Sequence, residues 1–89
     1  MLKITKIQES ASDVLLKLEG KITEQWAALL DGECRSYLRK RKSVHLDCSN
    51  VEYIDGRGVE VVNNFPRKQV TLMSTPTLVM ELLQAGGRS

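Results

Sequence analysis

The sequence predicts an α/β domain in which a mixed four-stranded sheet carries packed helices, in the order strand, strand, helix, strand, helix, strand, helix. Apolar residues alternate with polar ones in four short segments, which is the period of half-buried strands. They recur every three or four residues in three other segments, which is typical of amphipathic helices. Strands that alternate with helices favour parallel, right-handed crossovers.

The first half of the chain contains two predicted strands and one predicted helix. Apolar side chains alternate over residues 2–4 and 14–18, and we expect an antiparallel hairpin whose second strand ends at Gly20. A helical stripe runs over about residues 24–41, with Thr23 as its predicted N-cap. The stripe consists of Trp26, Leu29, Leu30, Cys34, Tyr37 and Leu38.

The middle of the chain predicts a third strand and a second helix. Residues 43–48 alternate in polarity, and the following Ser49 and Asn50 are predicted to turn the chain. A short apolar stripe at helical spacing begins at Gly58. Because proline cannot continue a helix, this second helix is predicted to stop at Pro66.

The last part of the chain predicts a strand and a helix. Val70–Met73 is the fourth strand. Thr75 and Pro76 form a helix-start signal, with threonine as the cap and proline at the first helical position. Gly86 and Gly87 are expected to end this helix.

Length and composition indicate one small domain. The chain has 89 residues, of which 42% are hydrophobic and 27% are charged. A chain of this size buries roughly 60 to 65% of its unfolded surface, enough for one shared core but not for two. We therefore expect a single domain over residues 1–89 and no two-domain enzyme.

The sequence predicts a cytoplasmic protein without membrane insertion. Its longest apolar run covers residues 26–30, whereas a membrane-spanning helix needs about 18 to 20 such residues. Charged and apolar residues alternate at the N-terminus, unlike in a signal peptide. Cys34 and Cys48 do not form the pattern of a disulfide framework and are predicted to be buried, reduced thiols.

Residue types that carry catalysis are sparse. His45 is the one histidine, and strand alternation directs it away from Cys48, so no local nucleophile–base pair forms. One histidine and two separated cysteines do not make a zinc site. Asp47 and Asp55 are predicted to cap backbone N–H groups. We expect no catalytic residue, no metal site and no cofactor.

The basic residues 39–42 lie where the first helix is predicted to end. Four positive charges there complement the helix dipole, although they could also contact phosphate. The net charge is only +2, and aromatic residues make up 4% of the chain. Because stacking on bases needs aromatic side chains, we expect no nucleic-acid interface.

The segment Asp55, Gly56, Arg57 and Gly58 is the candidate functional site. Its two glycines allow a tight turn into the second helix, so that free N–H groups at the helix start face outward beside a positive side chain. Such a loop can seat a protein partner or bind an anion. It can also be a plain turn without a ligand.

Three segments resemble a known family. Residues 47–55, DCSNVEYID, followed by a short loop, Gly58 and an apolar helix, resemble the signature of the STAS domain, which is the fold of bacterial anti-sigma factor antagonists and of sulfate transporter tails. Residues 18–22 and 82–86 resemble the flanking segments of that family. The resemblance implies a mixed sheet backed by helices and a non-enzymatic regulatory module in transcription.

The resemblance also implies which residues contact a partner. The working surface of the family lies at the loop formed here by Asp55 to Gly58, and its phosphorylated serine or threonine corresponds to Gly56, which has no hydroxyl. We therefore expect a protein partner, either an anti-sigma factor kinase-like protein or a transporter subunit, and no phosphorylation at this position. The alternatives are a subunit of a phospholipid ABC transport complex and a small anion- or nucleotide-binding domain. The oligomeric state has no sequence signal.

Overall fold

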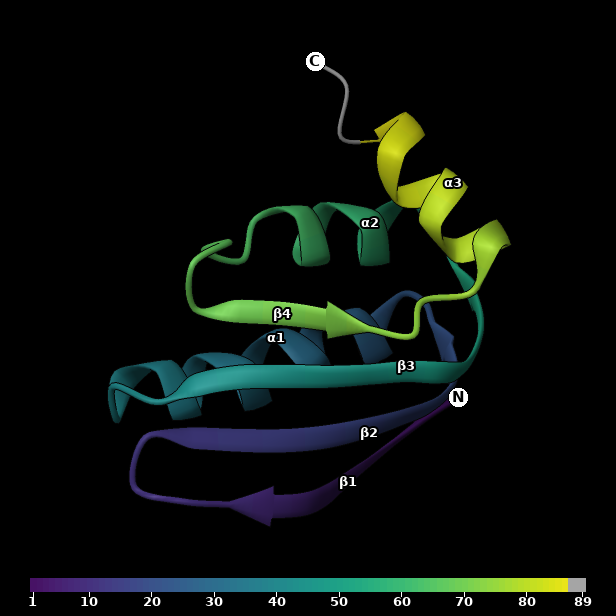
Figure 1. The fold of residues 1–89 in the computed structure, drawn as a ribbon. Coiled ribbons are helices and arrows are strands. Elements are labelled where there is room, and N and C mark those ends of the chain that lie inside the picture. The colour runs from purple at the N-terminus through teal and green to yellow at the C-terminus, as the bar shows by residue number, and fades with distance from the viewer. Residues whose placement is uncertain (87–89) are drawn as a thin grey trace.

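The structure is a computed structural model and describes residues 1–86. Its helices and strands follow the predicted order (Figure 1). They are β1 (Leu2–Glu9), β2 (Asp13–Ile22), α1 (Gln25–Arg39), β3 (Ser43–Ile54), α2 (Gly56–Asn63), β4 (Val70–Met73) and α3 (Thr77–Gly86). Gly87, half of the predicted stop signal, lies outside the described residues.

The four strands form one mixed sheet in the order β1-β2-β3-β4. β1 and β2 pair antiparallel, whereas β2 with β3 and β3 with β4 pair parallel. The predicted fold class and the predicted hairpin are therefore confirmed. The parallel pairs arise because α1 and α2 each return the chain to the same end of the sheet (Figure 1).

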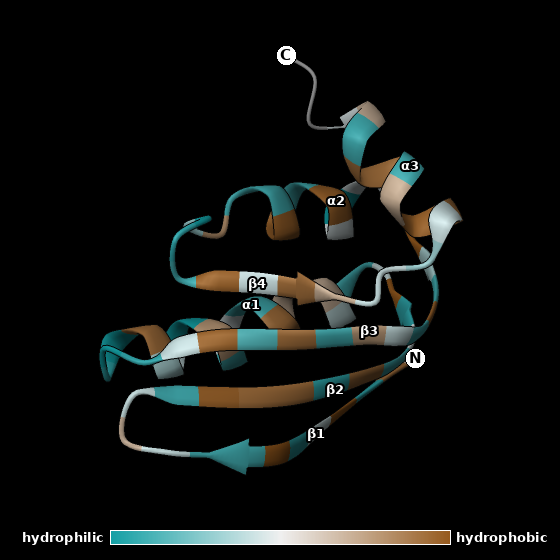
Figure 2. Ribbon diagram, in the orientation of Figure 1, coloured by the Kyte–Doolittle hydropathy of each residue, from teal (hydrophilic) through white to brown (hydrophobic). Residues whose placement is uncertain are grey.

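One face of the sheet carries the hydrophobic core. Alternate residues of the two central strands are buried on this face, and brown and teal positions alternate along β3 in Figure 2. These core residues are Val14, Leu16, Leu18, Val44, Leu46 and Cys48. From α1, Ala27, Leu30 and Cys34 belong to the same buried cluster. Each fully buried leucine contributes about 1.5–3 kcal/mol relative to exposure.

β3 extends further than the sequence pattern indicates. The predicted turn at Ser49 and Asn50 is wrong, because the strand continues to Ile54. The pairing with β2 shifts here, and the Ser49 N–H donates to Asp47 Oδ1 at 3.0 Å. This irregularity interrupts the alternation without ending the strand. Asp47 therefore satisfies a backbone N–H, as predicted, and this bond lowers the pKa of its carboxyl.

β2 likewise continues beyond its predicted end. Gly20 lies inside the strand with φ at 109°, and the register with β3 shifts just after it. A Cβ at this position would meet the carbonyl oxygen of Met1, which accepts a hydrogen bond from Lys21 N–H at 2.8 Å. Glycine is required here by a left-handed backbone and a close approach, not by the end of a strand.

The ends of the helices differ by a few residues from the prediction. α1 ends at Arg39, and Arg41 adopts a φ of 61°. α3 begins at Thr77, and the Pro76 carbonyl accepts a hydrogen bond from Met80 N–H at 2.9 Å. Thr75 therefore does not cap the helix, and its hydroxyl is buried without a partner among the described residues. Within residues 1–86, no helix has the length and apolar character to cross a bilayer.

Lys42 links the β1–β2 hairpin to the segment after α1, and Lys6 of β1 pairs with the same glutamate. Lys42 Nζ lies 2.6 Å from one carboxylate oxygen of Glu9, and Lys6 Nζ lies 2.9 Å from the other. Lys42 also donates to the Ser10 carbonyl at 2.8 Å. The hydrogen bond from Lys42, and to a smaller extent the one from Lys6, lowers the pKa of Glu9 from 4.5 to about 2.

The pKa of Glu9 predicts how stability depends on acidic pH. Because this pKa is lower in the folded protein, ionised Glu9 stabilises the fold above about pH 4.5, and this contribution is lost as the pH falls towards about 2. Glu9→Gln should reduce the loss of unfolding free energy in this range, as measured by urea denaturation at several pH values. Lys42→Met should act in the same direction, and an unchanged pH profile in Glu9→Gln would contradict the assignment.

Candidate functional site

Asp55 connects the start of α2 to the start of α1. Its Oδ1 accepts a hydrogen bond from Gly58 N–H at 2.8 Å, which caps α2, and its Oδ2 accepts one from Glu24 N–H at 3.0 Å. The Asp55 N–H itself donates to the Ile22 carbonyl at 3.2 Å. The predicted capping role of Asp55 is confirmed, and the same carboxylate also fixes the β2–α1 connection.

The β2–α1 connection is a strained turn. Trp26 N–H donates to the Thr23 carbonyl at 2.9 Å, and Glu24 between them has φ 47° and ψ −123°. These angles match the second residue of a type II′ turn, where glycine is preferred. The predicted N-cap at Thr23 is wrong, because Glu24 takes that position and makes no side-chain cap. A non-glycine residue there costs about 1–3 kcal/mol.

The two glycines of the loop have different surroundings. Gly58 is buried, and a Cβ there would meet the Ile22 carbonyl oxygen and lie 2.6 Å from Ile54 Cγ1. Gly56 is exposed, and a Cβ there would have no neighbour within 4 Å. Gly58 therefore allows α2 to approach the sheet, whereas Gly56 and the adjacent exposed Arg57 form the accessible part of the loop.

A hollow of about 730 Å³ lies beside this loop, between α2 and α3. Tyr53, Gly56 and Glu60 line it from the β3–α2 side, and Leu82 lines it from α3. The side chain of Asn63 donates to the Leu83 carbonyl at 3.1 Å and so links the two helices. Neither Tyr53 nor Leu82 was predicted as a site residue, because they line the same hollow only when α3 packs against α2.

The other candidate side chains lie elsewhere. His45 Nε2 is 2.9 Å from Asp13 Oδ1 on the sheet face opposite the core. Burial raises the pKa of the Cys34 thiol to about 12 and that of Cys48 to about 11. Both are free cysteines. Among the described residues, no three potential metal ligands of the His, Cys, Asp or Glu type lie together.

The basic residues that follow α1 make local contacts. Lys42 pairs with Glu9, and Lys40 Nζ lies 5.8 Å from the centre of the Tyr37 ring. Arg39 lies in the last turn of α1, where a positive charge complements the helix dipole. This arrangement supports a structural role for the cluster.

Comparison with known proteins gives matches in three-dimensional structure. No family model matches the chain, and no curated protein matches its sequence. The anti-sigma factor antagonist SpoIIAA in its unphosphorylated form matches with a TM-score of 0.72 and 11% identity, covering 92% of this chain and 82% of that chain. An anti-sigma factor antagonist from Mycobacterium paratuberculosis matches with a TM-score of 0.73 and 12% identity, covering 98% and 79%.

A third match, Mglu, has a TM-score of 0.68 and 19% identity, and covers 83% of this chain but 20% of that chain. At such identities the matches describe the fold, because one fold hosts many functions. They confirm the STAS-like fold predicted from the sequence.

The two glycines of the loop should respond oppositely to alanine. Gly58→Ala should lower the free energy of unfolding by about 3 kcal/mol, because the added methyl overlaps Ile22 and Ile54. Gly56→Ala should raise it by about 0.5–1 kcal/mol, because the site is open and glycine is a poor helix former. Urea denaturation of both variants measures this difference, and equal effects would contradict the described packing.

Two substitutions of Asp55 should distinguish the energetic contributions of the two hydrogen bonds that its carboxylate accepts. Asp55→Ala should cost about 2–3 kcal/mol of unfolding free energy, because it removes the cap of α2 and the acceptor for Glu24 N–H. Asp55→Asn should cost about 1 kcal/mol, because its single amide oxygen serves one of the two donors. If alanine and asparagine cost the same in urea denaturation, the double acceptor role is wrong.

Proposed function

We propose that this chain is a non-enzymatic regulatory module that docks reversibly on a protein partner through the loop Asp55 to Gly58. The proposal rests on the different roles of the four loop residues. Asp55 and Gly58 fix the backbone of the loop, whereas Gly56 and Arg57 are exposed to solvent. The loop belongs to a STAS-like fold. The structural neighbours with this fold include proteins described as anti-sigma factor antagonists.

The surroundings of the loop suit a protein partner. Arg57 supplies a positive charge and five N–H donors, and Tyr53, 43% exposed, supplies an aromatic surface next to the hollow between α2 and α3. Arginine and tyrosine are among the residue types that contribute most to binding energy at protein interfaces. The partner would bury Tyr53 and the lining of the hollow and pair its own acidic or carbonyl groups with Arg57.

Regulation at this loop would not use phosphorylation of residue 56. Gly56 has no hydroxyl, although the space around it would accept a side chain. Release of the partner would therefore depend on concentration or on modification of the partner. Two classes of partner remain: an anti-sigma factor kinase-like protein and a subunit of a lipid transport complex. Either partner would contact the same surface of this chain.

The anion-binding alternative has less support. The N-terminus of α2 already receives a carboxylate, because Asp55 accepts the hydrogen bond from Gly58 N–H. A bound phosphate would share this helix end with a negative charge 2.8 Å from one of its donors, and like charges there repel. Arg57 would have to offset that repulsion alone.

Affinity capture tests the proposed surface. The purified chain should retain a specific protein from a lysate of its source organism, and Arg57→Glu should reduce that capture at least tenfold. Arg39→Glu is the matched control, since it makes the same charge reversal on an exposed arginine at the far end of α1. Equal capture by the wild type and Arg57→Glu would place the binding surface elsewhere, and mass spectrometry of the captured protein distinguishes the two partner classes.

A further inference from the structure

The two edges of the sheet are protected to different degrees. β1, at one edge, carries Lys3 and Lys6, and its pairing with β2 is irregular between Lys6 and Gln8. Charges and bulges are the usual devices that prevent a sheet edge from pairing with another chain. β4, at the other edge, reads Val-Thr-Leu-Met, with no charge, no proline and no register shift. In charge and pairing regularity the β4 edge is therefore less protected than the β1 edge, although its length of four residues itself limits pairing.

Backbone groups of β4 face the open edge. Gln69 accepts a hydrogen bond from Val44 N–H of β3, at 2.7 Å. Because backbone groups alternate in direction along a strand, Val70 and Leu72 direct theirs away from β3. The Val70 N–H is satisfied by the Pro66 carbonyl at 2.9 Å. The Val70 carbonyl and both backbone groups of Leu72 therefore face the edge.

An apolar groove of about 430 Å³ runs beside this edge. Val70 and Leu72 line it from β4, Phe65 lines it from the segment after α2, and Met80 and Leu83 line it from α3. Met80 is 39% exposed. A strand added to β4 would thus find both backbone partners and an apolar groove for its alternate side chains, the two components of strand addition.

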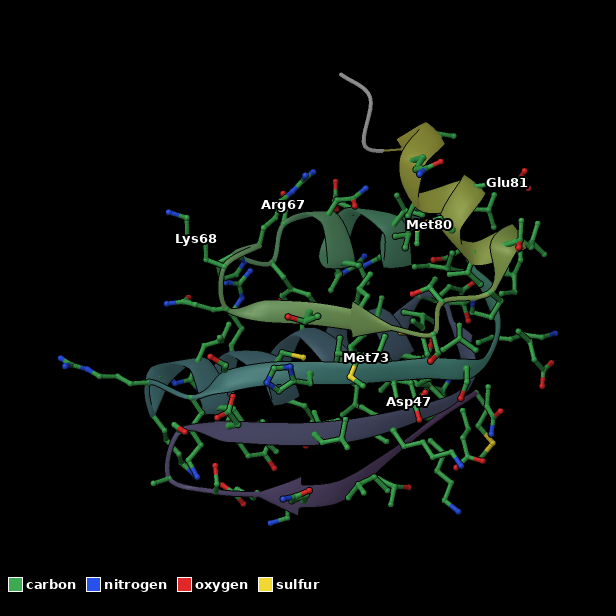
Figure 3. The ribbon with its side chains drawn as sticks, in the orientation of Figure 1. Asp47, Arg67, Lys68, Met73, Met80 and Glu81 are labelled. Carbon is green, nitrogen blue, oxygen red and sulfur yellow. The ribbon has the colours of Figure 1, made fainter. Side chains whose placement is uncertain are left out.

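The charges around the edge are opposite at its two ends. Arg67 and Lys68, both exposed, lie beside the start of β4, whereas Asp47 and Glu81 lie towards its other end (Figure 3). Asp47 is the residue of β3 that pairs with Met73, the last residue of β4. A two-fold axis through an antiparallel pair of β4 strands brings the basic end of one copy to the acidic end of the other.

We propose that the β4 edge is a docking surface for a second copy of this chain, with the two β4 strands antiparallel and Arg67 of each copy facing Glu81 of the other. The self-complementary charges favour this occupant over an unrelated strand. The pairing joins two four-stranded sheets into one, covers both grooves and leaves Arg57 and Tyr53 outside the contact. The dimer does not rest on the function proposed above, but the two surfaces share Arg67, which lines both the groove and the hollow beside the loop.

Sedimentation equilibrium of the full chain tests the association. Because each strand contributes only four residues, we expect a weak dimer with a dissociation constant of roughly 10–100 μM. Arg67→Glu and Glu81→Arg should each raise this constant at least tenfold, and the double variant should return it to within about threefold of the wild type. Arg39→Glu should leave it unchanged. A chain that stays monomeric up to about 1 mM, or a double variant without rescue, overturns the proposal.

Spin labels locate the interface. Thr71→Cys places a label on β4 and Thr5→Cys places the matched label on β1, while the buried Cys34 and Cys48 with their raised pKa values react poorly. In the proposed dimer, the Thr71 labels lie within about 20 Å of each other and the two β1 strands are about seven strand spacings apart, or roughly 34 Å. Electron paramagnetic resonance measures both distances. Short distances between the β1 labels with long distances between the β4 labels overturn the assignment.

Discussion

The geometry of the candidate site depends on the two hydrogen bonds that the Asp55 carboxylate accepts. One comes from Gly58 at the start of α2, and the other from Glu24, which lies 31 residues earlier in the sequence. A hydrogen bond to a charged group contributes about 1.5–3 kcal/mol. The turn conformation of Glu24 costs about 1–3 kcal/mol, so the Asp55 bond is of the size needed to hold it. One side chain thereby fixes the connections that begin both α1 and α2.

Of the two glycines in the loop that Asp55 fixes, one is required by the packing and the other is not. Gly58 is required because α2 approaches the Ile22 carbonyl too closely for any side chain. Nothing in the packing requires glycine at position 56, where a side chain would point into open space. The absence of a hydroxyl at Gly56 is therefore a property of the exposed surface and not a consequence of the fold. A side chain at position 56 would therefore change the exposed surface of the loop without disturbing the packing of α2.

Local patterns were enough to predict the order of the elements and the capping of α2 by Asp55, because each depends on residues close in sequence. The mixed sheet followed from that order, because strands joined through a helix pair parallel and strands joined by a short connection pair antiparallel. The predicted turn at Ser49 failed because a shift in strand pairing imitates a loop in the polarity pattern. The predicted N-cap of α1 at Thr23 was wrong because Glu24 takes that position, where the distant Asp55 carboxylate accepts a hydrogen bond from its N–H. Tyr53 and Leu82 were not predicted as site residues, because they line one hollow only when α3 packs against α2.

The lack of charge in β4 is not explained by the core. Val70 and Leu72 must be apolar, since they lie on the core face of the sheet opposite Val44 and Leu46. Thr71 and Met73 alternate with them and lie on the other face, where they are exposed. A lysine at either position would cost no core packing and would protect the edge, as lysines do on β1. The packing of the core therefore does not account for the uncharged edge, whereas the proposed pairing of two β4 strands is favoured by it.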